Sequence, residues 1–152
     1  MTKETPWDID YRVYRARADI VALSWAMKRS EATEEQFDEA LAPLAALLTT
    51  DRFHPEYYQK ISEIHMLKAK WLLSQKKSPE GTIARGLEMA DKALSIHPRM
   101  ATALETKGQL FAVRARLRGP AHLEAEEQAN AAFRAAIKLN PLLEIEERVQ
   151  IQ

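Results

Sequence analysis

The chain has 152 residues, enough for one domain of ordinary size with its own hydrophobic core. Its 22 basic and 22 acidic side chains give a formal net charge of zero, which argues against a dedicated nucleic-acid-binding protein. The absence of cysteine excludes disulfides, thiolate nucleophiles and cysteine-based metal sites. No run approaches the ~18 apolar residues of a membrane span, so we expect no membrane contact. The polar start of the sequence does not resemble a signal peptide, and the absence of cysteine fits a reducing compartment, so we expect a cytoplasmic protein.

Good helix formers dominate the sequence, and strand-like alternation of apolar and polar residues is absent. Thr33 with Gln36 predicts a capping box at the start of a helix. Ser78-Pro79 predicts a second helix start, and Gly119-Pro120 predicts the end of one helix and the beginning of the next. After a loose N-terminus at residues 1–7, we expect helices near residues 8–29, 33–50, 56–77, 79–96, 99–117, 121–139 and 142–151.

Three prolines divide the chain at a constant interval. Pro55, Pro98 and Pro141 each follow a short polar stop, and they lie 43 residues apart. The spacing predicts three repeating units of two helices each, at residues 13–55, 56–98 and 99–141, with a capping segment at 142–152. Because one helix pair cannot bury its apolar face alone, we expect the pairs to stack and share a core within a single domain at residues 8–152.

The third unit resembles a tetratricopeptide repeat (TPR). The family places a small residue and an aromatic in the first helix, then alanine, aromatic and alanine in the second helix, and a closing proline. Those positions are filled here by Gly108, Phe111, Ala129, Phe133, Ala136 and Pro141. The resemblance implies an all-α fold: a TPR-like right-handed α-solenoid of three helix pairs with a C-terminal capping helix.

The other two units match the family less closely. In the second, Gly86, Ala90, Ala93 and Pro98 fit, but His65 and Lys68 take the small and aromatic positions. In the first, Ala22 and Trp25 fit, whereas Pro43 takes the place of an alanine; a slip of three residues would put Ala40, Leu44 and Leu47 in that role. All three units exceed the usual length of about 34 residues. The pattern predicts a buried set of Trp25, Trp71, Ala90, Phe111 and Phe133.

Residues 86–147 also resemble the extended C-terminal TPR regions of some large bacterial serine/threonine kinases, through segments such as Ala136-Ile137-Lys138-Leu139-Asn140-Pro141. No kinase motif is present in this sequence. The resemblance therefore implies either a protein-interaction module or scaffold, or a structural or regulatory segment of a larger bacterial signalling protein without a separable ligand.

Residues with catalytic or metal-binding potential form no recognisable motif. The four histidines, His54, His65, His97 and His122, lack the spacing of a helical metal site, and the acidic pairs lie at neighbouring helix positions that do not face one site. There is no nucleophile elbow, phosphate-binding loop or dinucleotide motif. We expect no enzymatic activity, cofactor or metal, and a small-molecule ligand is not expected.

The TPR resemblance places the first helix of each pair on a concave surface that binds a protein or peptide. The groove residues that it implies are Asp19, Leu23, Met27, Gln59, Glu63, Met66, Lys70, Glu105 and Gln109. Acidic and apolar side chains in this set favour a partner with basic and apolar character, which could be another part of a parent protein.

Basic residues gather near the ends of the predicted first helices. Cations are favourable there because a helix C-terminus carries partial negative charge. Stacking of the units would also bring these ends together into one basic edge, an alternative binding surface for an acidic or phosphate-rich partner, formed by Lys76, Lys77, Arg114, Arg116 and Arg118.

Overall fold

The computed structural model describes the backbone of residues 6–143 and the side chains of residues 11–143. Within this part of the chain the protein is all helical, with no strand. Its helices are α1 (Pro6–Lys28), α2 (Glu34–Leu48), α3 (Pro55–Ser74), α4 (Glu80–Ile96), α5 (Ala101–Ala115) and α6 (His122–Leu139).

Every described helix was expected from the sequence, and the ends differ by three residues or fewer. The predicted capping box begins α2, where the backbone N–H of Thr33 donates to Gln36 Oε1 at 3.0 Å. The first seven residues were expected to be loose, but α1 already begins at Pro6; proline is well suited to a first helical turn. The predicted capping helix at 142–151 lies largely outside the described residues.

Two helices end in the same motif. Ser30 and Lys76 have φ angles of 59° and 58°, in the left-handed region. After α1, Glu31 N–H donates to the Ala26 carbonyl at 2.8 Å, and after α3, Lys77 N–H donates to the Leu72 carbonyl at 2.9 Å. This is the Schellman arrangement, in which glycine is the usual left-handed residue. The reversal ends α3 three residues earlier than the helix-forming sequence predicts.

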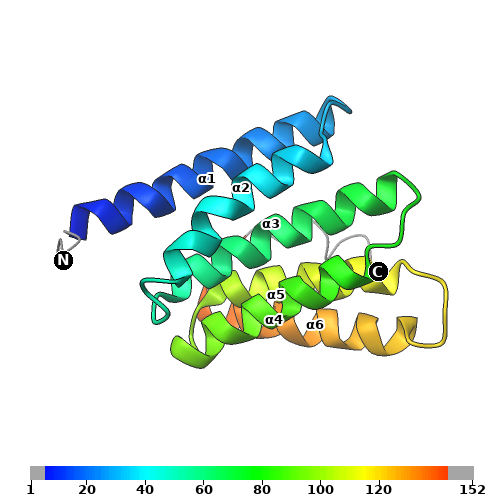
Figure 1. Ribbon diagram of the computed structural model, residues 1–152. Coiled ribbons are helices and arrows are strands. Elements are labelled where there is room, and N and C mark those ends of the chain that lie inside the picture. Colours follow the sequence, from blue (N-terminus) through cyan, green and yellow to red (C-terminus); the bar gives the residue numbers. More distant parts are fainter. Residues whose placement is uncertain (1–5, 144–152) are drawn as a thin grey trace.

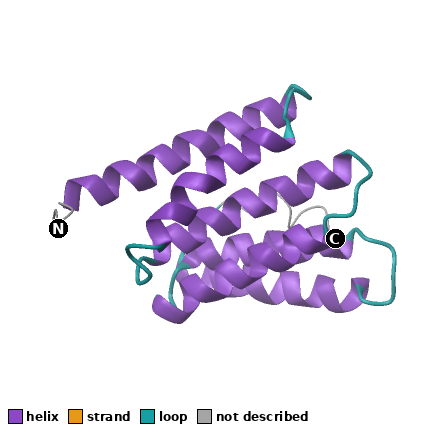
Figure 2. Ribbon diagram, in the orientation of Figure 1, coloured by secondary structure: helices purple, strands orange, loops and turns teal. Residues whose placement is uncertain are grey.

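The helices alternate in direction and pack in two kinds of contact (Figure 1). Sequence neighbours pair along the chain, most extensively α3 with α4 and α5 with α6. In addition, α1 contacts α3, and α3 contacts α5, so the first helices of successive pairs lie next to one another. The turns α1–α2, α3–α4 and α5–α6 consequently lie at one end of the molecule, and the turns α2–α3 and α4–α5 lie at the other (Figure 2).

Glycines allow the closest helix contacts. A Cβ atom at Gly108 would lie 2.6 Å from the ring of Phe133, so α5 and α6 approach to the distance that only glycine permits. At Gly86 of α4, a Cβ would lie 2.9 Å from Leu110 of α5 and 3.2 Å from the Cβ of His65. Both glycines occupy positions that the repeat pattern assigns to small residues, and Phe133, 1% exposed, fills the predicted gap.

The core is a continuous series of clusters along the stack. Phe37 and Leu44 of α2 join α1 and α3 at one end. In the centre, Met66 meets side chains of α4 and α5. At the other end, Phe111 and Phe133 pack between α5 and α6. Burial of Ala90, Phe111 and Phe133 is confirmed, and Trp71 is partly buried against Phe37, with ring centroids 5.4 Å apart.

The prediction that Trp25 is buried is wrong, because its side chain is 63% exposed. The core-facing side of α1 is formed instead by Ala16, Ile20, Leu23 and Met27, which follow helical spacing. Trp25 lies off this stripe, on a side of α1 that no described helix covers. The repeat pattern assigned Trp25 to the core because it assumed that the first pair packs like the third.

Candidate interaction surfaces

Polar side chains line the contact between α3 and α5, and we call this set the α3–α5 seam: Gln59, Glu63, Lys70, Glu105, Thr106 and Gln109. Gln59 Nε2 donates to Glu63 Oε2 at 3.2 Å and to Thr106 Oγ1 of α5 at 3.5 Å. Farther along, Lys70 Nζ donates to Gln109 Oε1 at 3.2 Å. The seam therefore joins two first helices through polar contacts rather than through a purely apolar core.

The seam holds two carboxylates that repel each other. Burial raises the pKa of Glu105, and the negative charge of Glu63 raises that pKa further. A hydrogen bond from Gln109 Nε2 at 3.4 Å and the charge of Lys70 oppose this rise. Glu63 is itself paired with Lys60 at 2.9 Å. Because the folded state disfavours a charged Glu105, an added cation at this point would be electrostatically favourable.

The structure brings together some of the predicted groove residues and separates others. Glu63, Lys70, Glu105 and Gln109 lie half-buried in the seam and keep part of their surface open to solvent. Gln59 and Met66 are buried, with 4% and 6% exposure, because they face α5 and α4 rather than solvent. These two side chains position the seam and offer almost no surface to a partner.

The three predicted groove residues of α1 do not join the seam. Leu23 is 4% exposed and belongs to the core, and Met27 packs against the same cluster. Asp19 is half-buried and lines a cleft between α1 and α2. The groove prediction failed here because α1 turns its apolar face toward α2 and α3, so the positions equivalent to the seam carry core residues.

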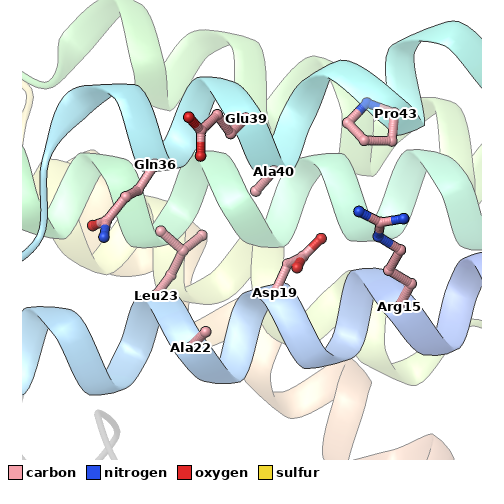
Figure 3. Close-up of a pocket in the computed structure, with 8 residues that line it drawn as sticks. All are labelled: Arg15, Asp19, Ala22, Leu23, Gln36, Glu39, Ala40 and Pro43. Carbon is pink, nitrogen blue, oxygen red and sulfur yellow. The ribbon is translucent and has the colours of Figure 1, made fainter.

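The cleft between α1 and α2 was not anticipated. Its polar part has a volume of about 240 Å³ and is lined by Arg15, Asp19, Gln36 and Glu39, among others. In Figure 3, Arg15, Asp19 and Leu23 of α1 project toward α2, and Gln36 and Ala40 of α2 project toward α1. An adjoining and more apolar part, of about 430 Å³, extends from Tyr11 to Leu47.

A proline borders this cleft. Pro43 lies inside α2 and lines both parts of the cleft. Proline has no N–H to donate to the carbonyl four residues earlier, here that of Glu39, and its ring crowds that carbonyl. In the sequence, Pro43 stands out only as a departure from the repeat pattern.

The predicted basic edge lies at the end of the molecule that carries the α3–α4 and α5–α6 turns. Its residues differ in their accessibility to a partner, because Arg114 makes contacts within the protein. Arg114 pairs with Glu80 at 2.7 Å, and its guanidinium lies 5.9 Å from the centre of the Phe111 ring. Lys77 lies over Trp71 at 5.8 Å. Lys76, Arg116 and Arg118 are exposed, and Arg118 borders a shallow cavity next to the start of α6.

One histidine has a strongly altered environment. Burial, together with the positive charges of Arg85 and Lys68, lowers the pKa of His65 to about 4, and the charge of Asp38 opposes this shift. Its Nδ1 is buried without a hydrogen-bond partner. His65 lies against Gly86, where the repeat pattern expects a small residue on α3. We interpret it as a neutral packing residue.

Within residues 11–143, no group of three histidine, aspartate or glutamate side chains is placed to hold a metal ion. In the described part of the chain, no helix has the length and apolar character needed to cross a membrane. No protein-family model matches the chain, and none of the curated proteins matches it either.

A further surface was missed at the sequence level. Tyr11, Tyr14, Val21 and Trp25 are 55–71% exposed and lie along one side of α1. With the exposed Ala18 they follow an alternating spacing of three and four residues, which is the spacing of an apolar helical stripe. The spacing is visible in the sequence, but it does not tell which of two apolar stripes on one helix other helices cover.

Proposed function

We propose that this protein is a non-catalytic protein–protein interaction module, built as a right-handed solenoid of TPR-like helix pairs. The observation that carries the proposal is the contact of α1 with α3 and of α3 with α5, which forms a layer of first helices. Stacked helix pairs of this type present such a layer as an extended binding surface. The glycine contact between Gly108 and Phe133 supports the TPR resemblance at the position where that family requires a small residue.

The α3–α5 seam is the proposed contact surface for a basic and apolar peptide segment. Glu63 and Glu105 lie close enough for the charge of one to raise the pKa of the other. A lysine or arginine from a partner would relieve this repulsion and gain a charge-assisted hydrogen bond. As part of the same proposal we place the module in the cytoplasm, since a protein without cysteine suits a reducing compartment.

Selection from a random peptide library displayed on phage tests the proposal with the full chain as bait. Enriched sequences should combine basic with apolar residues. The double variant Glu63→Gln/Glu105→Gln should bind them at least about tenfold more weakly, a loss of about 1.4 kcal/mol. Glutamine keeps the size and hydrogen-bonding reach of glutamate, which matters because both side chains are half-buried.

The matched control reverses charge on the basic edge, with Lys76→Glu/Arg118→Glu. Both side chains are exposed, whereas a change at Arg114 would break its ion pair with Glu80. This control should leave binding of the selected peptides unchanged. A different result would contradict the seam assignment: the selection enriches acidic peptides, and only the basic-edge variant abolishes their binding. The binding site would then be the basic edge.

The alternative is a structural or regulatory TPR segment of a larger bacterial signalling protein, without a separable ligand. It differs from the first proposal in the outcome of the same selection. A structural segment should return no enriched sequence, even though circular dichroism shows the bait to be folded. Enriched peptides that are sensitive to the glutamine variant would contradict this alternative.

A further inference from the structure

The exposed stripe on α1 holds four of the eight large apolar side chains that are exposed in the described part of the chain. Tyr11, Tyr14 and Trp25 are 66%, 71% and 63% exposed, and Val21 is 55% exposed. Single exposed apolar side chains are ordinary, but contiguous patches mark interaction sites. The core-facing stripe of the same helix, from Ala16 to Met27, is separate from it, so α1 carries apolar residues on two sides.

The order of residues along the stripe is symmetric. Ala18 and Val21 lie at its middle, Tyr14 and Trp25 lie at equal distances on either side, and Tyr11 and Lys28 lie at its ends. If two copies of α1 pair antiparallel about this midpoint, each Tyr14 lies opposite the partner's Trp25. Each Ala18 then lies opposite the partner's Val21. Small residues at the centre allow close approach, with aromatic rings on both sides.

The charged residues beside the stripe are compatible with the antiparallel pairing of two copies. Arg15 and Arg17 flank the stripe on α1. In the antiparallel pairing each faces a small neutral residue of the second copy, Ala22 or Ser24, so like charges are not opposed. At the ends, Lys28 meets the partner's Tyr11; within one chain Lys28 already lies 6.0 Å from the centre of the Trp25 ring, which shows that its ammonium reaches aromatic faces from this position.

The available area suits a dimer of modest stability. An aromatic side chain buries about 150–250 Å² when fully covered. Given the exposed fractions, pairing would remove on the order of 500 Å² per copy from water, or about 1,000 Å² in total. That total is near the lower limit of about 1,000–1,200 Å² for specific interfaces. We therefore expect dissociation in the micromolar range rather than an obligate dimer.

We propose that the protein forms a symmetric dimer in which the exposed stripe of α1, defined by Tyr11, Tyr14, Ala18, Val21 and Trp25, pairs antiparallel with the same stripe of a second copy. The interface would be isologous, as in most homodimers, and would use the same patch on both subunits. It lies on a different helix from the α3–α5 seam, so it does not depend on the peptide-binding proposal.

Sedimentation velocity of the full chain from about 1 to about 100 µM tests the proposal. The wild-type protein should shift from monomer to dimer across this range. Val21→Arg should weaken dimerisation at least tenfold, because it places a charge at the apolar centre beside the partner's Arg15 and Arg17. Leu123→Arg is the matched control: Leu123 is 61% exposed on α6, and its change should leave the dimer intact.

Cysteine cross-linking tests the orientation, since the chain has no cysteine of its own. Arg15→Cys and Ala22→Cys chains, both changed at exposed positions, should form a disulfide when mixed. Neither should cross-link with itself, because the antiparallel pairing separates identical positions along the axis by about 13 Å at residue 15 and about 7.5 Å at residue 22. Both separations exceed the Cα–Cα distance of up to about 7 Å that a disulfide spans. A wild-type monomer at every concentration, a dimer unaffected by Val21→Arg, or self-cross-linking of Arg15→Cys would each overturn the proposal.

Discussion

The two ends of the helical stack are built differently. In the α3–α6 half, glycines at 86 and 108 let neighbouring helices approach closely, and aromatic and aliphatic side chains fill the gaps. In the α1–α2 pair, contact between the helices is slight, α2 contains a proline, and a cleft lies between them. The α1–α2 pair has alanines, among them Ala22 and Ala40 in the cleft, but no glycine. The comparison teaches that close helix approach in this fold accompanies glycine at the contact.

The largest expected effect on stability concerns the closely packed α3–α6 half. Phe133→Ala should destabilise the protein by about 3–5 kcal/mol, because Phe133 is 1% exposed and its removal leaves a cavity against Gly108. Chemical denaturation monitored by circular dichroism measures the change. Leu123→Ala on the same helix, at an exposed position, should cost less than about 0.5 kcal/mol. Equal losses for the two variants would show that Phe133 is not a core residue.

Adding a methyl group at the closest contact between α5 and α6 should also destabilise the protein, because it overfills the contact instead of leaving a cavity. Gly108→Ala should destabilise by about 1–3 kcal/mol, because its Cβ would lie 2.6 Å from a buried aromatic ring. Gly81→Ala, where nothing lies within 4 Å, is the matched control and should be neutral or slightly stabilising. If Gly108→Ala also stabilises the protein, helix propensity outweighs the close approach and the contrast between the two halves is weakened.

His65 predicts a pH dependence of stability. Its folded pKa is about 4, below the ordinary value of 6.5, so the unfolded chain takes up this proton first as the pH falls. The contribution is constant above about pH 6.5 and is lost progressively toward the folded pKa. Between about pH 7 and about pH 5.5 it should cost about 1 kcal/mol. His65→Leu should remove this part of the dependence, and an unchanged slope would assign it to other groups.

The smallest effect tests the turns that the two regions share. Ser30 follows α1 and Lys76 follows α3, both with left-handed backbones. Replacing either by glycine should stabilise the protein by up to about 1 kcal/mol, because glycine adopts this conformation without steric cost. Thermal unfolding compares the two variants with wild type. A loss of stability in Lys76→Gly alone would indicate that its side chain contributes at the basic edge.

Local sequence patterns predicted the helices well. They could not predict which side chains are buried by contacts between helices. The Thr33–Gln36 capping pattern, the proline punctuation and the pairing of Gly108 with Phe133 all depend on neighbours at fixed spacing, which a sequence reports directly. Trp25 was misplaced because its burial depends on whether another helix covers α1, and no local signal carries that information.

The candidate surfaces were predicted only in part, for the same reason. Glu63 and Glu105 lie near each other at the seam, where the charge of Glu63 raises the pKa of Glu105. The period of 43 residues places them one residue out of register on equivalent turns of α3 and α5. Asp19 occupies the corresponding region of α1 but lines the cleft instead. Its position depends on how closely α1 and α2 pack, which residue spacing alone does not determine.

Hydrogen exchange followed by mass spectrometry tests the central claim most directly. That claim is that α3–α6 form a closely packed half, whereas the α1–α2 pair is loosely packed and associates with a second copy through α1. At about 1 µM the amides of α3–α6 should exchange far more slowly than those of α1 and α2, because local opening is easiest where buried contacts are few. At about 100 µM the protection of α1 should rise while that of α3–α6 stays constant. Equal protection of all six helices at low concentration, with no response of α1 to concentration, would contradict this account.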